Sequence, residues 1–401
     1  GIIRFIEKQF SMKKRTVNAS HTPLYREAGF KLKDSETTRQ AFAEELDHPH
    51  EPQNYIYSRY RNPTVVAAEK QIMALEGSEW ALLAETGMAA IDIAVSLFQK
   101  GKETRPWLFF NEIYGGTNSF IDSVLIKRRG LDIQKFYAED GLYDLDKLED
   151  LLKELKPEFL YFEAVSNPML IVADVKGIMA LAKKYDVKTI IDNTFGTPQL
   201  WKPLEDGATL VIHSVTKYLS GHGDITAGVV CGNDPDLFKE AIVYRTWAGH
   251  FFSPDDAHRL SDQLKTFQLR FQQHCKNAME IARFLENHPL IEKVLYPGLE
   301  SHSTYHEAKT LFGDKGFGGM ITFDIKGKDD DEKRNRCNAL IAALEDHIPL
   351  IPTLGEADTI LMPIEPVWGA KYPLPGMIRL SVGIEDSQEL VRVIGEALSL
   401  V

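Results

Sequence analysis

The sequence is poor in cysteine, and its three cysteines, Cys231, Cys275 and Cys337, lie far apart. No two of them stand at the close spacing of a CxxC pair or of a zinc ligand set. We therefore expect neither a disulfide framework nor a zinc site. A chain that needs no disulfides suits a reducing compartment, and we expect it to be cytoplasmic.

Long apolar runs are also missing. No stretch approaches the roughly 20 apolar residues that a membrane helix requires. The N-terminal segment 1–14 contains isoleucine and phenylalanine, but charges interrupt it, unlike the apolar centre of a signal peptide. Met12, followed by Lys-Lys-Arg, is a possible natural start, in which case residues 1–11 would be foreign to the natural chain. No membrane partner is expected.

Basic residues are outnumbered. The chain has 46 lysines and arginines against 58 acidic residues, a formal net charge of −12. Because no basic stripe is present to neutralise phosphates, nucleic acid is not an expected partner. The length of 401 residues, with 44% apolar and 26% charged residues, fits an ordinary soluble protein with room for two domains.

Short apolar runs alternate with segments of helical spacing. Strands are predicted at 107–110, 159–162 and 188–192, and helices at 64–77, 145–155 and 177–185. Continuous apolar strands between helices indicate an α/β fold whose central sheet is mostly parallel and covered by helices on both faces. Ligands of such folds bind at the carboxyl ends of the strands.

Three parts are predicted along the chain. Residues 1–60 form an N-terminal arm, polar and irregular over 12–54, and residues 61–254 form the ligand-binding domain. Residues 255–401 form a smaller C-terminal α+β domain. It begins with a long helical section from about Asp255 to Asn287, and strands are predicted at 316–325 and 378–384. The charged run 329–334 indicates a solvated loop and helix start.

Polar residues follow three of the predicted strands. Gly87 and Met88 open a helix, where backbone N–H groups can bind a phosphate, although a simple helix cap explains the same residues. Asp192 closes an apolar strand, where burial requires a cationic partner, although a turn aspartate is about as common.

The third of these sites contains Lys217, preceded by Ser214 and Thr216 and followed by glycines. The two hydroxyl groups could bind a phosphate while the lysine forms a Schiff base. Together with Asp192 as a partner for a ring nitrogen, these groups are the set that pyridoxal phosphate requires. The histidines His213, His222 and His250 have no metal-ligand spacing, so we predict no metal.

Longer stretches resemble the cysteine/methionine-metabolism family of pyridoxal-phosphate enzymes, which includes cystathionine synthases and lyases, methionine γ-lyase and O-acylhomoserine sulfhydrylases. The resemblance covers the chain from about residue 55 to near its end. The matching stretches are YSRYRNPT (57–64), ETGMAAI (85–91), NEIYGGT (111–117), SNP (166–168), DNTFGTP (192–198), HSVTKYLSGHGDITAG (213–228), LYPGL (295–299), GFGGM (316–320) and RLSVGIED (379–386).

The resemblance implies a fold-type-I pyridoxal-phosphate enzyme and gives roles to its cofactor-binding residues. Lys217 would form the Schiff base and move protons, and Asp192 would hold the pyridinium nitrogen. Tyr114 would stack on the ring, and Asn167 would bond its hydroxyl group. The phosphate would be bound by Gly87, Met88, Ser214 and Thr216 and by the neighbouring subunit's Tyr57 and Arg59.

The resemblance also implies an amino-acid substrate and a homo-oligomer. Arg379 would bind the substrate carboxylate, with Tyr114, Asn167 and Thr353 beside it. Subunits would form dimers with shared sites, paired into a tetramer. A fold-related aminotransferase or a non-catalytic binding protein fits the motifs less well.

The reaction within the family is less closely specified. Gly223 and the segment 352–361 resemble methionine γ-lyase, so elimination from a sulfur-containing amino acid is predicted, with γ-replacement by a thiol as the alternative. Gly116 stands where that lyase usually has cysteine, and Arg245-Thr246 where it usually has Lys-Asp. Thr353 replaces an expected serine, and the loop 362–376 is short, which indicates an unusual substrate.

Overall fold

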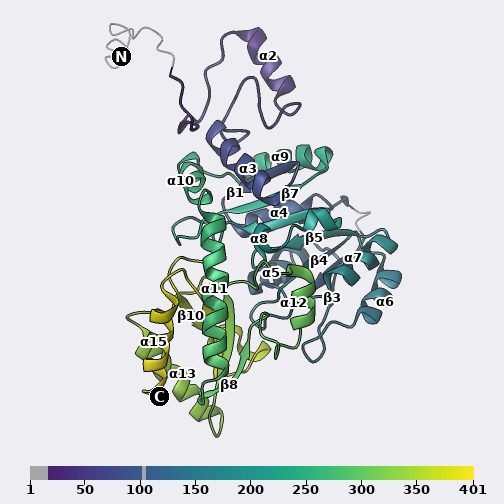
Figure 1. Ribbon diagram of the computed structural model, residues 1–401. Helices are drawn as coiled ribbons and strands as arrows, with labels where there is room; N and C mark the ends of the chain where they lie inside the picture. Colours follow the sequence, from purple (N-terminus) through teal and green to yellow (C-terminus); the bar gives the residue numbers. More distant parts are fainter. Residues whose placement is uncertain (1–16, 102–104) are drawn as a thin grey trace.

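A computed structural model describes residues 17–101 and 105–401 (Figure 1). The possible start at Met12 lies outside these residues. The larger sheet has seven strands, and β7 runs antiparallel to both of its neighbours while the other pairs are parallel. The predicted, mostly parallel α/β sheet is thus confirmed. The strand order is β1 (Trp80–Ala84), β7 (Gly228–Gly232), β6 (Leu210–Ser214), β5 (Lys188–Asp192), β4 (Phe159–Glu163), β2 (Trp107–Phe110) and β3 (Ile133–Phe136).

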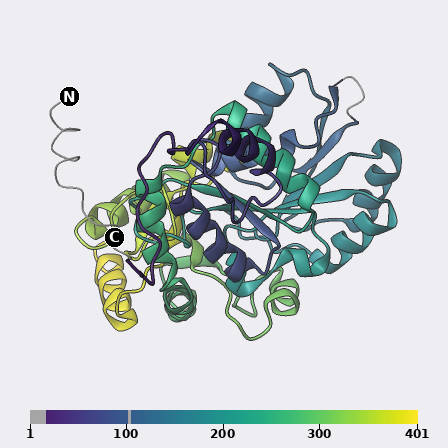
Figure 2. The ribbon, with the colours of Figure 1, turned by 90° about the horizontal axis from the view of Figure 1, so that it is seen from above.

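Helices cover both faces of this sheet (Figure 2). Its inner strands are buried along nearly their whole length, which explains why they read as continuous apolar runs. None of the described helices is both long and apolar enough to cross a membrane. The helices are α3 (Pro63–Glu76), α4 (Gly87–Ser96), α5 (Gly115–Phe120), η2 (Ile121–Ile126), α6 (Leu145–Leu155), α7 (Val175–Lys184), α8 (Thr197–Leu200), η3 (Pro203–Asp206) and α9 (Pro235–Ala248).

Helix α3 shows how local sequence sets the element bounds. The side chain of Asn62 caps the helix by accepting the backbone N–H of Thr64 at 2.8 Å, and Pro63 occupies the first helical position. The helix stops at Gly77, whose φ of +70° lies in the left-handed region that glycine adopts without strain. The predicted helix at 64–77 therefore agrees with the structure to within a residue.

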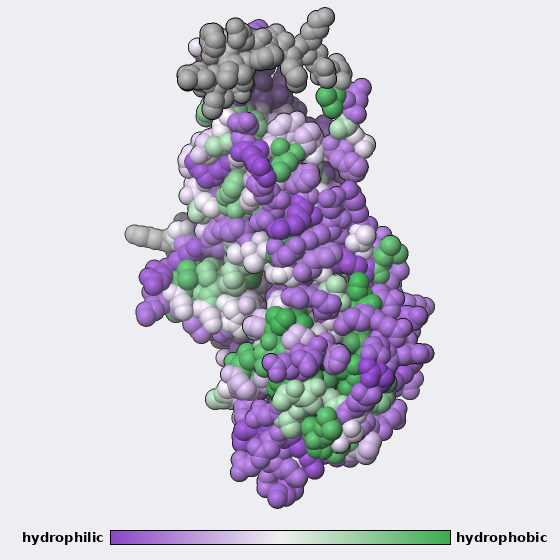
Figure 3. Space-filling view, turned by 90° about the vertical axis from the view of Figure 1, so that its left-hand side faces the viewer, coloured by the Kyte–Doolittle hydropathy of each residue, from purple (hydrophilic) through white to green (hydrophobic). Residues whose placement is uncertain are grey.

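A second, antiparallel sheet lies in the C-terminal part, in the order β10 (Ile360–Pro363), β11 (Met377–Ser381), β9 (Met320–Ile325) and β8 (Ile291–Leu295). Strand β9 is shorter than predicted because Gly316 and Gly318 have φ values of +119° and +93°. Apolar side chains gather on one face at the level of this sheet (Figure 3). The accompanying helices are α12 (Tyr305–Phe312), α13 (Asp330–Leu344) and α15 (Ser387–Leu398).

The helical section predicted from about Asp255 to Asn287 is confirmed, but it is not a single helix. The structure has two helices, α10 (Pro254–Leu264) and α11 (Phe267–Glu286), separated at Lys265-Thr266. The buried guanidinium of Arg270 accounts for the break, because it donates to the carbonyl of Gln263 at 2.9 Å and to the carbonyl of Tyr218 at 2.8 Å. The carbonyl at the end of α10 thereby gains a partner outside the helix, and α11 is tied to the loop that follows Lys217.

The predicted irregular arm is also partly wrong, because it contains helix α2 (Ser35–Glu44). Asp34 caps this helix by accepting the N–H of Thr37 at 2.8 Å. The helix stands away from the body of the chain at the top of Figure 1. Its exposed Phe42 leaves an apolar ring in solvent.

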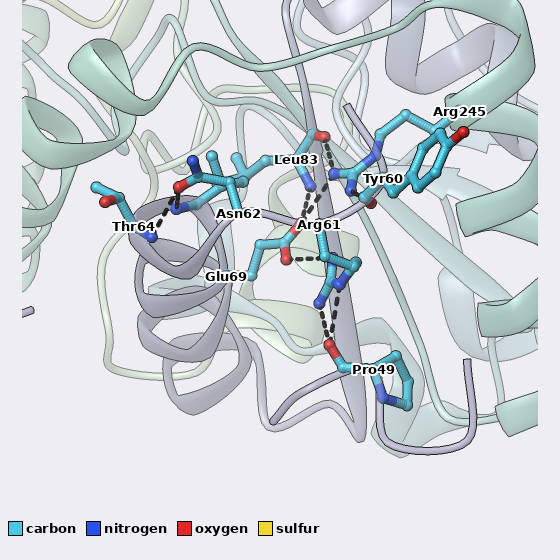
Figure 4. Close-up of polar contacts among 9 residues, drawn as sticks. Pro49, Tyr60, Arg61, Asn62, Thr64, Glu69, Leu83 and Arg245 are labelled. Atoms are coloured by element: carbon cyan, nitrogen blue, oxygen red, sulfur yellow. Dashed lines mark hydrogen bonds and ion pairs between the residues drawn. The ribbon is translucent and has the colours of Figure 1, made fainter. Parts of the chain in front are cut away.

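A buried charge cluster fixes the arm to the large sheet (Figure 4). Glu69 of α3 accepts from Arg61 at 2.8 Å and from Arg245 of α9 at 3.2 Å, and all three side chains are buried. Arg61 also donates to the carbonyl of Pro49 in the arm at 2.9 Å, and Arg245 donates to that of Leu83 in β1 at 2.8 Å. The other terminal nitrogen of Arg245 donates to the carbonyl of Tyr60 at 3.2 Å, and this forked set of contacts explains the arginine at position 245.

We expect Glu69→Gln to destabilise the protein strongly. The amide leaves two buried guanidinium groups without a negative partner, a change that costs about 3–5 kcal/mol. Urea unfolding of the purified full-length protein measures this loss. Glu36→Gln is the control, because it removes an exposed ion pair with Arg39 and should change little. Equal unfolding curves for Glu69→Gln and the wild type would contradict the role of the cluster.

Candidate active site

One pocket of about 540 Å³ lies at the carboxyl ends of β4, β5 and β6. This is the place that an α/β sheet of this kind predicts. The predicted residues that line it are Gly87, Met88, Tyr114, Asn167, Asp192, Ser214, Thr216, Lys217, Thr353 and Arg379. Tyr57 and Arg59 do not line it.

Lys217 lies in the loop that follows β6. Its Nζ donates to Oγ1 of Thr353 at 2.8 Å, so the threonine found in place of serine keeps the hydroxyl contact. Burial, with a smaller effect of the Arg379 charge, lowers the pKa of Lys217 to about 8. A lysine with this pKa is partly unprotonated near neutral pH and can act as a nucleophile or base.

Two buried carboxylates close neighbouring strands. Asp192 ends β5, Glu163 ends β4, and the two are paired in register. Burial raises the pKa of Asp192, against the opposing effect of two hydrogen bonds from Thr194. Burial, together with the Asp192 charge, raises the pKa of Glu163 well above its usual range. A cation beside Asp192 would stabilise its charged form.

The end of the pocket at the start of α4 suits a phosphate. Helix α4 begins at Gly87, and its cap, Thr86, accepts the N–H of Ala89 at 2.9 Å. A Cβ atom at position 87 would lie only 3.1 Å from Oγ of Ser214, so glycine keeps the space between backbone and hydroxyl open. The N–H groups at a helix start, together with a nearby hydroxyl, are ready donors to an anion. Oγ1 of Thr216 accepts the backbone N–H of Ala227 at 2.9 Å.

The ring of Tyr114 lies over Gly116. A Cβ atom at position 116 would come within 2.4 Å of its Cε1 atom, so the cysteine found there in methionine γ-lyases does not fit this ring position. The backbone N–H of Tyr114 donates to both oxygens of Glu163 at 3.1 Å. Glu163 thus fixes the backbone of Tyr114, whose ring is expected to stack on the cofactor.

Arg379 is the second cation in the pocket. It lies on β11, where it donates to Oδ1 of Asn167 at 2.9 Å and to the carbonyl of Thr353 at 3.2 Å. Burial lowers its pKa to about 10. Among the described residues, no carboxylate pairs with it, so a buried positive charge faces the pocket. A substrate carboxylate would supply the missing charge.

Tyr57 and Arg59 lie apart from the pocket. The guanidinium of Arg59 donates to the carbonyl of Thr246 at 3.0 Å and lies 5.2 Å from the ring of Tyr57 and 5.7 Å from that of Trp247. Their predicted contact with a neighbouring subunit's cofactor is therefore compatible with their position and stays a prediction. They make no contact with the pocket of their own chain.

The histidines singled out in the sequence have polar partners. His213 bonds to buried Glu76 at 2.7 Å, and His222 bonds to the carbonyl of Ser220. His250 lies between Glu85 and Asp92 at 3.0 and 2.8 Å, and these bonds raise its pKa to about 9.

Two parts of the pocket were not predicted. Glu163 ends an apolar strand just as Asp192 does, so the same signal could have found it. Met362, Val367 and Trp368 also line the pocket; the loop 362–376 that contains them was associated with the substrate, but no single residue of it was predicted. We call these three residues the apolar wall.

The residues present fit pyridoxal phosphate. Gly87 leaves open space beside the Ser214 hydroxyl at a helix start, which suits a phosphate. Asp192 is a buried carboxylate that a pyridinium nitrogen would neutralise, and Lys217 has the lowered pKa of a nucleophile. Lys217, Asp192 and the start of α4 would hold the cofactor, with Tyr114 against its ring.

Known proteins share the whole length of this architecture. From residue 5 to residue 399 the chain matches the family described as Cys/Met metabolism PLP-dependent enzyme. It is 37% identical over 359 residues to the cystathionine beta-lyase of Lactococcus lactis, covering 87% of this chain and 89% of that protein. It is 33% identical over 384 residues to the L-methionine gamma-lyase of Porphyromonas gingivalis, covering 92% and 90%.

A solved structure agrees with these matches. The cystathionine gamma synthase of Xanthomonas oryzae pv. oryzae, in complex with cystathionine, has a TM-score of 0.81 at 28% identity, covering 94% of this chain and 92% of that one. The resemblance and the predicted cofactor, pyridoxal 5′-phosphate, are confirmed, and the names of the two relatives agree with the predicted lyase class. The chain therefore belongs to the Cys/Met metabolism family of pyridoxal-phosphate-dependent enzymes.

Proposed function

We propose that this enzyme catalyses elimination from a sulfur-containing amino acid such as methionine, cystathionine or homocysteine. The observation that carries the proposal is the meeting of Lys217 and Arg379 in one pocket, both in contact with Thr353. Arg379 can fix a substrate carboxylate there while Lys217 reaches the reacting carbon. The family relatives named as lyases support the same reaction class.

Each residue then has a chemical task. Pyridoxal phosphate, when bound, supplies an electron sink that stabilises negative charge on the substrate's Cα. Lys217, with its pKa near 8, takes the Cα proton, and Thr353 orients its Nζ through the 2.8 Å hydrogen bond. Asp192 provides the opposite charge for the ring nitrogen. The ring of Tyr114 covers the reacting atoms.

Gly223 is a point at which the sequence resembles methionine γ-lyase, and the packing around it requires a glycine. Its φ is +66°, and a Cβ atom there would lie 2.4 Å from Oε1 of Glu356, a residue whose charge acts on Lys217. A serine, as the synthases tend to have, would displace Glu356 from this position. γ-Replacement by a thiol is the second candidate, and the fold similarity to a cystathionine gamma synthase supports it.

Product analysis tests the proposal. Methionine, cystathionine, homocysteine and O-acetylhomoserine are each supplied with and without added sulfide. Elimination releases a 2-oxo acid and ammonia in both conditions, whereas replacement forms a new thioether or thiol only when a thiol or sulfide is present. From cystathionine, β-elimination gives pyruvate and γ-elimination gives 2-oxobutanoate. Release of ammonia from none of these compounds would refute the proposed lyase.

The proposal includes a homo-oligomer with shared active sites. Arg59 lies outside its own pocket, among the exposed rings of Tyr57 and Trp247, and Trp247 is 70% exposed. Exposed aromatic side chains around an arginine are typical of an interface. A partner subunit that covers them would receive Arg59 at its phosphate, over an interface of well over ~2,000 Å². A tetramer built from two such dimers is the full proposal.

We expect two inactive variants to complement each other. Lys217→Ala removes the reacting amine from its own chain's site, and Arg59→Ala removes the phosphate contact from the partner's site, so both losses fall in the same site of a hybrid dimer. Mixed chains should recover part of the activity, because one site of the hybrid dimer carries both wild-type residues. Failure to recover activity, once mass spectrometry has shown subunit exchange, would argue against shared sites. A monomer in analytical ultracentrifugation would contradict the assembly itself.

A cytoplasmic location is proposed as well. All three cysteines are free and buried, so the fold needs no oxidising compartment. Fractionation of cells that produce the protein would test this.

A further inference from the structure

The short segment after β10 lies against the active site. It contains helix α14 (Glu365–Trp368) and the turn η4 (Gly369–Lys371), and it is part of the loop that departs from the family pattern. Val367 and Trp368 of this segment line the same pocket as Lys217 and Arg379. This segment therefore forms part of the proposed substrate site.

This segment is held at both ends. Glu365 accepts two hydrogen bonds from Arg334 of α13, at 2.7 and 3.0 Å, and Lys371 donates to the carbonyl of Asn111 at 3.2 Å. Between these anchors, the Trp368 side chain packs against the small core that contains Ile364, and the backbone N–H of Trp368 donates to the Ile364 carbonyl at 2.9 Å. Trp368 is thus a fixed surface of the pocket.

Trp368 lies beside the group that binds the substrate carboxylate. The Cζ atom of Arg379 is 5.6 Å from the centre of a ring of Trp368, in cation–π contact. Asn167 and Thr353 hold two other sides of the guanidinium. A carboxylate bound to Arg379 therefore places the rest of the substrate next to the indole.

The described lining of the pocket has no charged side chain to spare for the rest of the substrate, and Glu356, whose charge acts on Lys217, lies outside this lining. Beside the apolar wall, the uncharged Pro352 and Leu354 line this end. The lining contains the charged side chains Glu163, Asp192, Lys217 and Arg379, and each already has a task in the site described above. A second charged head group would be desolvated here without a partner from the described lining, which is unfavourable.

We propose that the apolar wall, and Trp368 above all, determines substrate specificity by favouring amino acids with a short apolar side chain, such as a methyl thioether, over those with a second charged group, such as cystathionine. This inference rests on the proposed function, because it names the substrate class of the same site. Trp368 supplies a flat apolar surface for the side chain and excludes the water that a distal charge needs.

A matched pair of ligands tests the wall apart from catalysis. L-Norleucine and L-2-aminoadipate have six-carbon chains that differ only in a terminal methyl or carboxylate, and neither has a sulfur leaving group. Their binding to the holoenzyme is read from the change in cofactor absorbance. The wild type should bind norleucine at least about tenfold more tightly, and Trp368→Ala should lose most of this preference.

Trp368→Phe is the conservative control, because it keeps a flat apolar ring and should keep most of the preference. The kcat/KM ratio of methionine to cystathionine should fall in Trp368→Ala in the same way. An equal loss for both ligands in Trp368→Ala, or equal binding of both by the wild type, would overturn the inference. Preferential binding of norleucine without any elimination would refute the proposed function and leave the wall supported.

Discussion

Replacing Lys217 by alanine is expected to abolish turnover. The alanine has no amine to bind the cofactor covalently and no base to take the Cα proton. Because proton transfer and covalent catalysis each contribute several powers of ten, kcat should fall by roughly four orders of magnitude or more. The visible absorption of a lysine-bound pyridoxal cofactor should disappear from the purified variant.

Lys188→Ala is the matched control for this experiment. Lys188 is exposed at the first position of β5, so its loss removes a lysine and leaves the pocket intact. Circular dichroism of both variants should match the wild type, which separates a lost amine from a lost fold. Normal turnover by purified Lys217→Ala would show that another lysine carries the chemistry.

The core helices and strands were predictable because their buried residues are apolar and regularly spaced along the sequence. The strand at 188–192 and the helix at 145–155 have the bounds that the sequence predicts, since apolar spacing and an adjacent cap fix both ends. The break between α10 and α11 was not predictable in this way. It depends on the Arg270 guanidinium, whose carbonyl partners include Tyr218, 52 residues away. Helix α2 was missed although Asp34 gives an ordinary cap signal.

The active site, like the fold, was predictable from the sequence only in part. Motifs place Lys217, Asp192 and Arg379, and the fold brings them into one pocket. Trp368 could not be found from sequence, because it enters the pocket on a helix of one turn that an ion pair between Glu365 and Arg334 fixes. The position of Gly116 under the Tyr114 ring likewise depends on tertiary placement. Local patterns thus specify the cofactor site better than the substrate site.

The charged residues of the pocket connect the proposed cofactor site with the proposed substrate site. Glu163 and Asp192 are buried carboxylates with raised pKa values, and Lys217 and Arg379 are partly or fully buried cations with lowered pKa values. Each set is unfavourable as it stands, since burial opposes charge in both. A pyridinium nitrogen beside Asp192 and a substrate carboxylate beside Arg379 would stabilise the charged forms of these two residues. The pocket is therefore organised to bind oppositely charged groups at two points.

The exchange of Asp192 for asparagine tests one of these points. The amide has almost the same shape and can still accept from Thr194, but it carries no charge to keep the ring nitrogen protonated. Loss of one partner of a buried charge pair costs about 3 kcal/mol or more, and each 1.4 kcal/mol is about tenfold in rate. Turnover should therefore fall by roughly a hundredfold or more, while some cofactor stays bound.

Glu163→Gln is the matched control for Asp192→Asn, because it also replaces a buried carboxyl group by an amide at the same register of the neighbouring strand. Burial, together with the Asp192 charge, raises the pKa of the Glu163 carboxyl and so opposes its charged form, and Glu163 is not the proposed partner of the ring nitrogen, so its amide should lose far less activity. If both variants lost turnover equally, a general effect of altering this strand end would explain the loss. If Asp192→Asn kept wild-type turnover, the carboxylate would have no part in holding the ring nitrogen. A selective loss at position 192, with cofactor absorbance still present, is the result that the charge argument requires.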